Sequence, residues 1–208
     1  MHYIFDFDGT LVDSMPIWAN THIKALTEHG IACPENFVET ITPLGNIKAA
    51  EYALSLGVKA TLEEHVNKIN TYLYEQYTTI VPLKETVKET LSALKNQGHR
   101  LHVLTASPHL YVDACLKRLG VFEIFENVWT IEDFGCTKSE TIIYEKTAER
   151  LNGKLSECIF VDDNFTAIST AKKAGMKTVA IYEKLSENYE DKLKATADNY
   201  VYRFSEML

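Results

Sequence analysis

From Pro82 to the end of the chain, short apolar segments alternate with longer amphipathic ones. The apolar segments have the length and composition of buried β-strands, whereas the amphipathic ones space their apolar residues three to four apart, as helices do. Strands that alternate with helices pair in parallel and leave both faces of the sheet to be covered by helices. The sequence therefore predicts an α/β domain with a doubly wound parallel sheet.

Proline, glycine and capping residues predict where these elements begin and end. Pro82 and Gly98 bracket one amphipathic helix, and the next helix begins with Ser107 as its cap and Pro108 as its first residue. A further helix is expected over KSETIIYEKTAERL, with Ser139 as a possible cap. The expected strands lie in the segments HYIFDFD, RLHVLTAS, NVWTI, CIFVDDN, KTVAIY and DNYVYRF.

The stretch between the first strand and Pro82 shows helical spacing and no convincing strand. We therefore expect residues 1–14 and 81–208 to form the α/β core, with residues 15–80 inserted as an all-α cap after the first strand. Within this insert, the segment LGNIK breaks the helical pattern. Lys48, at its end, is a candidate for binding a remote anionic group of a substrate.

Two aspartates follow the apolar residues of the first strand. Asp6 and Asp8 are two residues apart, so in an extended strand their side chains point to the same side. Two like charges on one buried face are costly unless a cation or a shared proton compensates them. Taken alone, the pair could equally be ordinary turn residues, because Asp-Gly marks turns.

Polar residues also end other predicted strands, where open α/β sheets bind their ligands. Thr105 ends the second strand, Lys138 follows the third, and the fourth ends in Asp162, Asp163 and Asn164. Together with Asp6 and Asp8, these positions offer four carboxylates, one hydroxyl and one lysine. Oxygen ligands of this kind suit Mg²⁺, and a phosphoryl group between the metal and the lysine would have its charge offset on both sides.

These residues resemble the four motifs of the haloacid dehalogenase superfamily of phosphotransferases. DFDGTLVDS resembles the first motif, Thr105 the second, Lys138 the third and VDDN the fourth, in the family's order and over almost the whole chain. The helical insert resembles the cap of the branch that contains phosphoglycolate phosphatase and β-phosphoglucomutase. One departure is Ser139, which stands where many members of this branch have proline.

The resemblance implies a role for each matched residue. Asp6 would be the nucleophile, Asp8 the acid/base, Thr105 a phosphoryl hydrogen-bond donor and Lys138 the neutralising cation. Mg²⁺ would be the cofactor, and the implied ligands are Asp6, the backbone carbonyl of Asp8, Asp162 and Asp163. The expected substrate-binding residues are Gly9, Thr10, Ala106, Ser107 and Lys48.

The composition of the chain limits the classes of partner that it can bind. A formal net charge of −8 argues against nucleic-acid binding, which needs a basic face. No apolar run could cross a bilayer, no signal peptide is recognisable, and four scattered cysteines are typical of a reduced compartment. We expect a cytoplasmic monomer or weak homodimer that acts on a small phosphorylated metabolite.

Three functions remain in competition at this point. A phosphatase and a phosphomutase of the β-phosphoglucomutase type would share every catalytic residue, and would differ only in whether water or a second hydroxyl accepts the phosphoryl group. A non-enzymatic phospho-acceptor such as a response-regulator receiver also uses aspartates, a hydroxyl and a lysine. In receivers, however, the acidic pair comes first in the chain, whereas here it comes last.

Overall fold

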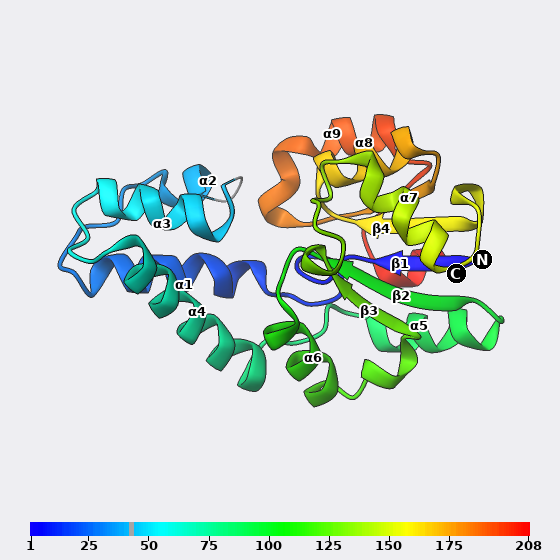
Figure 1. The fold of residues 1–208 in the computed structure, drawn as a ribbon, viewed down its shortest axis with the longest axis horizontal. Helices are drawn as coiled ribbons and strands as arrows, with labels where there is room; N and C mark the ends of the chain where they lie inside the picture. Colours follow the sequence, from blue (N-terminus) through cyan, green and yellow to red (C-terminus); the bar gives the residue numbers. More distant parts are fainter. Residues whose placement is uncertain (42–43) are drawn as a thin grey trace. The chain divides into compact units, whose positions relative to one another are not determined.

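The computed structural model describes residues 1–41 and 44–208 and divides them into two compact units (Figure 1). Residues 1–13 and 82–208 form the sheet unit, and residues 14–81 form the helical unit. Each division lies one residue away from the corresponding boundary expected from the sequence. Thr42 and Pro43, which belong to the predicted insert, lie outside the described residues.

The sheet unit contains six parallel strands in the order β3-β2-β1-β4-β5-β6. The expectation of a parallel α/β sheet is therefore confirmed. β1 lies between β2 and β4, so that Phe5 pairs with Val103 on one side and with Val161 on the other. The strands are β1 (His2–Phe5), β2 (Arg100–Thr105), β3 (Asn127–Thr130), β4 (Cys158–Asp162), β5 (Lys177–Ile181) and β6 (Asn199–Val201).

Helices cover both faces of this sheet. Figure 1 shows α5 and α6 on one side and α7, α8 and α9 on the other. The chain passes from β1 outward to β3 and then crosses to β4, so the strand order reverses between β1 and β4. Ligands of open α/β sheets bind beyond the carboxyl ends of strands at such a reversal. The helices are α5 (Val87–Asn96), α6 (His109–Arg118), α7 (Thr141–Arg150), α8 (Phe165–Ala174) and α9 (Glu190–Thr196).

The helix expected from Pro82 begins only at Val87. The five residues before it run beside the loop that follows β1: the Asp13 N–H donates to the Pro82 carbonyl, and the Lys84 N–H donates to the Leu11 carbonyl. These hydrogen bonds use backbone groups that a helix would need internally. The amphipathic pattern was correct for α5 and wrong for the segment 82–86.

Two other helix starts also differ from expectation. Ser107 does not cap α6, which begins at His109; its hydroxyl hydrogen-bonds to Asp8 instead. α7 begins at Thr141, so Lys138 and Ser139 lie in the preceding loop. In both places a side chain or backbone segment at the carboxyl edge of the sheet is used for tertiary contacts rather than to start a helix.

The described residues of the helical unit form four helices. The apolar core of this unit is formed by Leu26, Phe37, Ile41, Ala49, Ala53 and Val58. Thr61 begins the longest helix with a capping box, in which its hydroxyl and the Glu64 carboxylate satisfy each other's backbone N–H groups. The expected break at LGNIK is wrong, because residues 45–48 are the first turn of α3. The helices are α1 (Met15–Thr27), α2 (Phe37–Ile41), α3 (Gly45–Ser55) and α4 (Leu62–Thr79).

Over residues 1–41 and 44–208, no helix has both the length and the apolar character that crossing a membrane requires.

Candidate active site

Asp6 is the first residue after β1 and lies between the neighbouring strands β2 and β4. Its backbone N–H donates to the Val161 carbonyl at 2.8 Å, which extends the pairing with β4 by one residue. Ile4, Phe5 and Phe7 are fully buried, and Asp6 itself is only 5% exposed. The burial of this strand therefore carries a carboxylate into the interior at the carboxyl edge of the sheet.

The loop after Asp6 is built around a glycine. Gly9 has a φ of +71°, which side-chain-bearing residues rarely adopt, and a Cβ built on it would lie 2.9 Å from Oδ1 of Asp163. The next residue, Thr10, is fully buried and donates its hydroxyl to the same Asp163 oxygen at 3.0 Å. Glycine is therefore needed both for the turn and for the close approach of the acidic residue.

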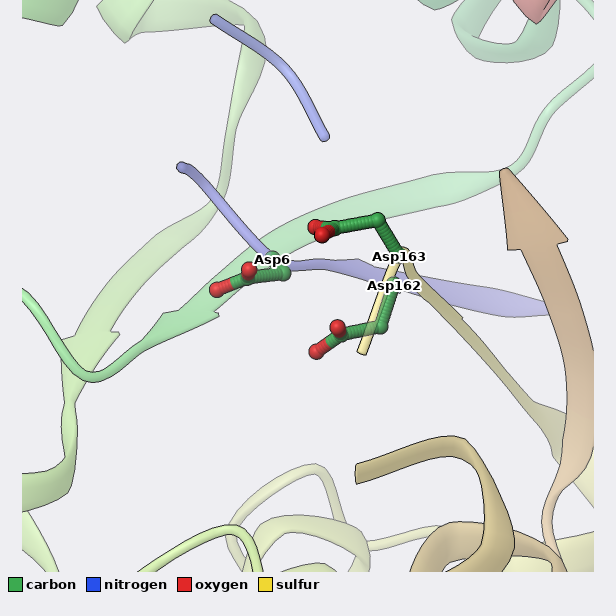
Figure 2. Close-up of side chains that lie close together, drawn as sticks. All are labelled: Asp6, Asp162 and Asp163. Atoms are coloured by element: carbon green, nitrogen blue, oxygen red, sulfur yellow. The ribbon is translucent and has the colours of Figure 1, made fainter. Parts of the chain in front are cut away.

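Asp162, the last residue of β4, and Asp163, which follows it, complete a cluster of three carboxylates. One carboxylate oxygen from each of Asp6, Asp162 and Asp163 lies within 4.8 Å of the others, and Figure 2 shows the three side chains gathered from β1 and β4. The Asn164 N–H donates to Asp162 Oδ1 at 2.7 Å, while the Asn164 side chain caps α8 by accepting from the N–H groups of Thr166 and Ala167. The helix start therefore helps to fix the acidic pair.

Lys138 is the cation of this cluster. Its Nζ lies 2.6 Å from Asp6 Oδ1 and donates to Asp162 Oδ2 at 2.8 Å. Burial opposes the charged form, but Asp162 and Asp6 outweigh it and raise the pKa of Lys138 above its ordinary value. The Tyr144 hydroxyl lies 2.8 Å from the Lys138 carbonyl and holds the loop in place although Lys138 is not part of a helix.

The cluster is electrostatically unbalanced. Burial raises the pKa of Asp6 well above its ordinary value, with Lys138 opposing the shift and the neighbouring aspartates adding to it. Burial, Asp162 and Glu183 raise the pKa of Asp163 to about 7. Three carboxylates face one ammonium group, and a divalent cation would offset the excess charge. Because every donor is a carboxylate oxygen, the residues fit a hard cation such as Mg²⁺.

Asp8 stands apart from the three clustered carboxylates. Its Oδ2 accepts a hydrogen bond of 2.5 Å from the Ser107 hydroxyl, and the Ser107 N–H in turn donates to the Thr105 hydroxyl at 3.0 Å. Thr105 is buried at the end of β2, whereas the adjacent Ala106 is exposed. The structure therefore links the first and second motifs through Ser107.

Lys48 lies elsewhere, in the helical unit. It is exposed on α3, and its role as a contact for a remote anionic group stays a prediction.

Four residues that support the site were not anticipated from the sequence. The Ser186 hydroxyl donates to Asp163 Oδ2 at 3.2 Å, Lys84 pairs with Glu183 beside the Gly9 loop, and Tyr144 holds the Lys138 loop. Glu183 and Ser186 follow β5, and the rule that ligands bind beyond strand ends could have drawn attention to them. Lys84 and Tyr144 lie within amphipathic segments, where nothing in the sequence distinguishes them.

Comparison with known proteins matches this chain to the family whose motifs its sequence resembles. The family model described as "Haloacid dehalogenase-like hydrolase" matches residues 3–181. Pyrophosphatase PpaX from Bacillus velezensis is 29% identical over 180 residues, which covers 86% of this chain and 81% of that protein.

Solved structures share the fold at low sequence identity. A predicted phosphoglycolate phosphatase from Haemophilus somnus has a TM-score of 0.83 at 23% identity, with coverage of 99% of this chain and 95% of that one. CbbY from Rhodobacter sphaeroides, in complex with phosphate, has a TM-score of 0.83 at 17% identity and the same coverage.

The family model covers most of the chain, and all the residues matched to its motifs in the sequence lie on β2 and β4 or in the segments that follow β1, β3 and β4. The resemblance inferred from the sequence is confirmed: this chain belongs to the haloacid dehalogenase-like hydrolase family and is an enzyme of the hydrolase class.

Proposed function

We propose that this protein is a Mg²⁺-dependent phosphatase that hydrolyses a small phosphorylated metabolite through an aspartyl phosphate on Asp6. The observation that carries the proposal is the buried cluster of Asp6, Asp162 and Asp163 with Lys138 as its single paired cation among the described residues. Phosphatase and pyrophosphatase names among the relatives support the same class of substrate.

Asp6 is the nucleophile in this proposal. Lys138 holds one of its oxygens at 2.6 Å and so fixes the direction in which the carboxylate faces. Attack of the other oxygen on phosphorus would form the aspartyl phosphate and break the bond to the ester oxygen. A bound Mg²⁺ would offset the charge of the phosphoryl oxygens, and Asp6, Asp162 and Asp163 are the residues that would hold it, with the Asp8 backbone carbonyl as the further ligand that the family resemblance implies.

Asp8 is the proposed acid and base. In the first step its carboxyl proton passes to the leaving oxygen, and in the second its carboxylate takes a proton from the water that hydrolyses the aspartyl phosphate. The Ser107 hydroxyl, 2.5 Å from Asp8 Oδ2, would orient this carboxyl group. Thr105 would hydrogen-bond the phosphoryl group, and Gly9, Thr10 and Ala106 would line its surroundings.

The wider setting belongs to the same proposal. A small metabolite substrate suits a family member with a helical insert, and Lys48 of that insert is proposed to contact a remote anionic group. We also propose that the protein is cytoplasmic and either a monomer or a weak homodimer.

Asp6→Asn tests the nucleophile. We expect turnover of p-nitrophenyl phosphate with Mg²⁺ to fall below detection, because an amide cannot form the aspartyl phosphate. Circular dichroism should remain that of the wild type, since asparagine has nearly the same shape and removes one of the clustered negative charges. Asp13→Asn is the matched control, because Asp13 is exposed and follows the same loop; it should keep wild-type turnover.

Chelation separates the metal from the nucleophile in the same assay. EDTA should stop turnover, and added Mg²⁺ should restore it. Full activity of D6N would contradict the role of Asp6, whereas wild-type activity in EDTA would contradict the role of the metal.

A further inference from the structure

Lys84 is a half-buried cation that the proposed chemistry does not use. It lies in the segment before α5, its side chain is 19% exposed, and it forms an ion pair of 2.9 Å with Glu183, whose side chain is 6% exposed. A buried ion pair of this kind costs desolvation, so its position beside the candidate metal site calls for an explanation.

All three N–H groups of the Lys84 ammonium have acceptors. Nζ donates to the Gly9 carbonyl at 2.8 Å, to the Tyr182 carbonyl at 2.8 Å and to the Glu183 carboxylate at 2.9 Å. An ammonium group has three donors and no more. Lys84 therefore has no N–H left for a phosphoryl group, and its hydrogen bonds join the loop after β1 to the segment after β5.

These two segments supply the hydrogen bonds that Asp163 accepts. Thr10, next to Gly9, donates to Asp163 Oδ1 at 3.0 Å, and Ser186 donates to Asp163 Oδ2 at 3.2 Å. The Ser186 N–H donates to the Glu183 carbonyl at 2.9 Å, which ties the serine to the ion pair. Lys84 is thus joined to Thr10 through its hydrogen bond to the neighbouring Gly9, and to Ser186 through Glu183, whose carbonyl accepts from the Ser186 N–H.

We propose that Lys84 is a positioning residue for the metal site: it holds Gly9 and Glu183 at the separation at which Thr10 and Ser186 together orient the Asp163 carboxylate. The inference rests on the proposed metal-dependent function and adds residues that the family motifs do not include. Residues that orient metal ligands from outside the ligand shell typically change metal affinity by about 10–100-fold when they are removed.

Two variants distinguish an effect of the Lys84 hydrogen bonds on the metal site from an effect of the local charge. E183Q changes the net charge by one unit but keeps Lys84 and leaves it an amide oxygen as acceptor. K84M/E183M leaves the net charge unchanged but removes the Lys84 hydrogen bonds to the Gly9 and Tyr182 carbonyls, without burying an unpaired charge. K95M is the matched control, because Lys95 also donates to two backbone carbonyls, at the end of α5.

Mg²⁺ affinity is measured by isothermal titration calorimetry on the protein without substrate, together with the melting temperature of each variant. We expect K84M/E183M to bind Mg²⁺ about 10-fold or more weakly than the wild type. E183Q and K95M should stay within about threefold of it. A K84R variant, which keeps the charge but spreads its N–H groups over a planar fork, should lie between and covers the case in which the double variant does not fold.

The outcomes are separable. Wild-type Mg²⁺ affinity in both K84M/E183M and K84R, or an affinity that changes in E183Q and not in the double variant, overturns the positioning role. A lowered melting temperature with unchanged affinity also overturns it, because it leaves only a structural role. Failure of the wild type to bind Mg²⁺ at all overturns the proposed function itself.

Discussion

Gly9 is the residue at which backbone conformation and the chemistry of the site are most closely joined. Its positive φ turns the chain after the candidate nucleophile, and its missing Cβ leaves room for the Asp163 carboxylate. Other described glycines also have a positive φ, but a Cβ built on any of them would meet open space or ordinary van der Waals contacts. The close approach to Asp163 is what gives Gly9 a role beyond the turn.

Gly9→Ala should therefore lower phosphatase turnover and Mg²⁺ binding as well as stability. An alanine at positive φ costs about 1 kcal/mol of folding free energy, and here the added methyl group would also press on Asp163 Oδ1. We expect a similar loss of stability in chemical denaturation for G9A and for the control G98A, because Gly98 has a φ of +82° but open space around it. Phosphatase turnover and Mg²⁺ binding should fall only in G9A. Equal turnover in the two variants would contradict the importance of this contact.

At the scale of elements, the site is assembled where strands end and the next segment begins. Asp6 directly follows β1, Asp162 ends β4 with Asp163 next to it, and α8 starts directly afterwards with Asn164 as its cap. The segment 82–86 before α5 shows the opposite outcome, since it has a helical pattern but its residues 82–84 pair with the loop after β1 instead. Local pattern predicts a helix there, and tertiary hydrogen bonds override its first turn.

Asn164→Ala tests how far the α8 cap supports the site. Its side-chain oxygen satisfies two backbone N–H groups, so we expect the alanine variant to lose about 1 kcal/mol of unfolding free energy. Asn164→Ser is the matched control, because serine caps nearly as well as asparagine, and it should stay close to the wild type. The measurement is urea unfolding at neutral pH with Mg²⁺ present. Equal losses in the two variants would show that the lost stability does not come from the cap.

At the scale of the whole molecule, the buried carboxylates make the stability of the metal-free protein depend on pH. The pKa of Asp163 is raised to about 7 in the folded protein, against about 3.9 in an unfolded chain. The folded state therefore binds more protons between these values, and the free energy of unfolding falls as the pH rises through this interval. Burial lowers the pKa values of His22 and His102 to about 4, which acts in the opposite direction between about pH 4 and 6.5.

Asp163→Asn isolates the carboxylate contribution from that of the histidines. In EDTA, the melting temperature of D163N should rise relative to the wild type as the pH increases from about 4 to 7, because unfolding releases the Asp163 proton only in the wild type. Mg²⁺ at neutral pH should raise the melting temperature of the wild type more than that of D163N. A difference between the two proteins that does not change with pH would contradict the raised pKa of Asp163.

Patterns in the amino-acid sequence predict the parallel α/β sheet, the family and the carboxylates that the fold gathers. They can do so because apolar periodicity sets which segments become strands, and because parallel strands bring their carboxyl ends to one edge. Asp6 is far in the chain from the adjacent pair Asp162 and Asp163, yet each of the three ends or directly follows a strand, so their proximity follows from topology.

The contacts that hold the carboxylate cluster in place, in contrast, are visible only in the folded structure. The three hydrogen bonds of Lys84, the Ser186 contact to Asp163 and the Ser107 contact to Asp8 join segments that no local pattern relates. Such contacts depend on the path of loops and on which buried polar groups still need a partner, and these are properties of the folded chain. For the same reason Ser107 does not cap a helix as expected: its hydroxyl donates a hydrogen bond to the Asp8 carboxylate, which lies within its reach.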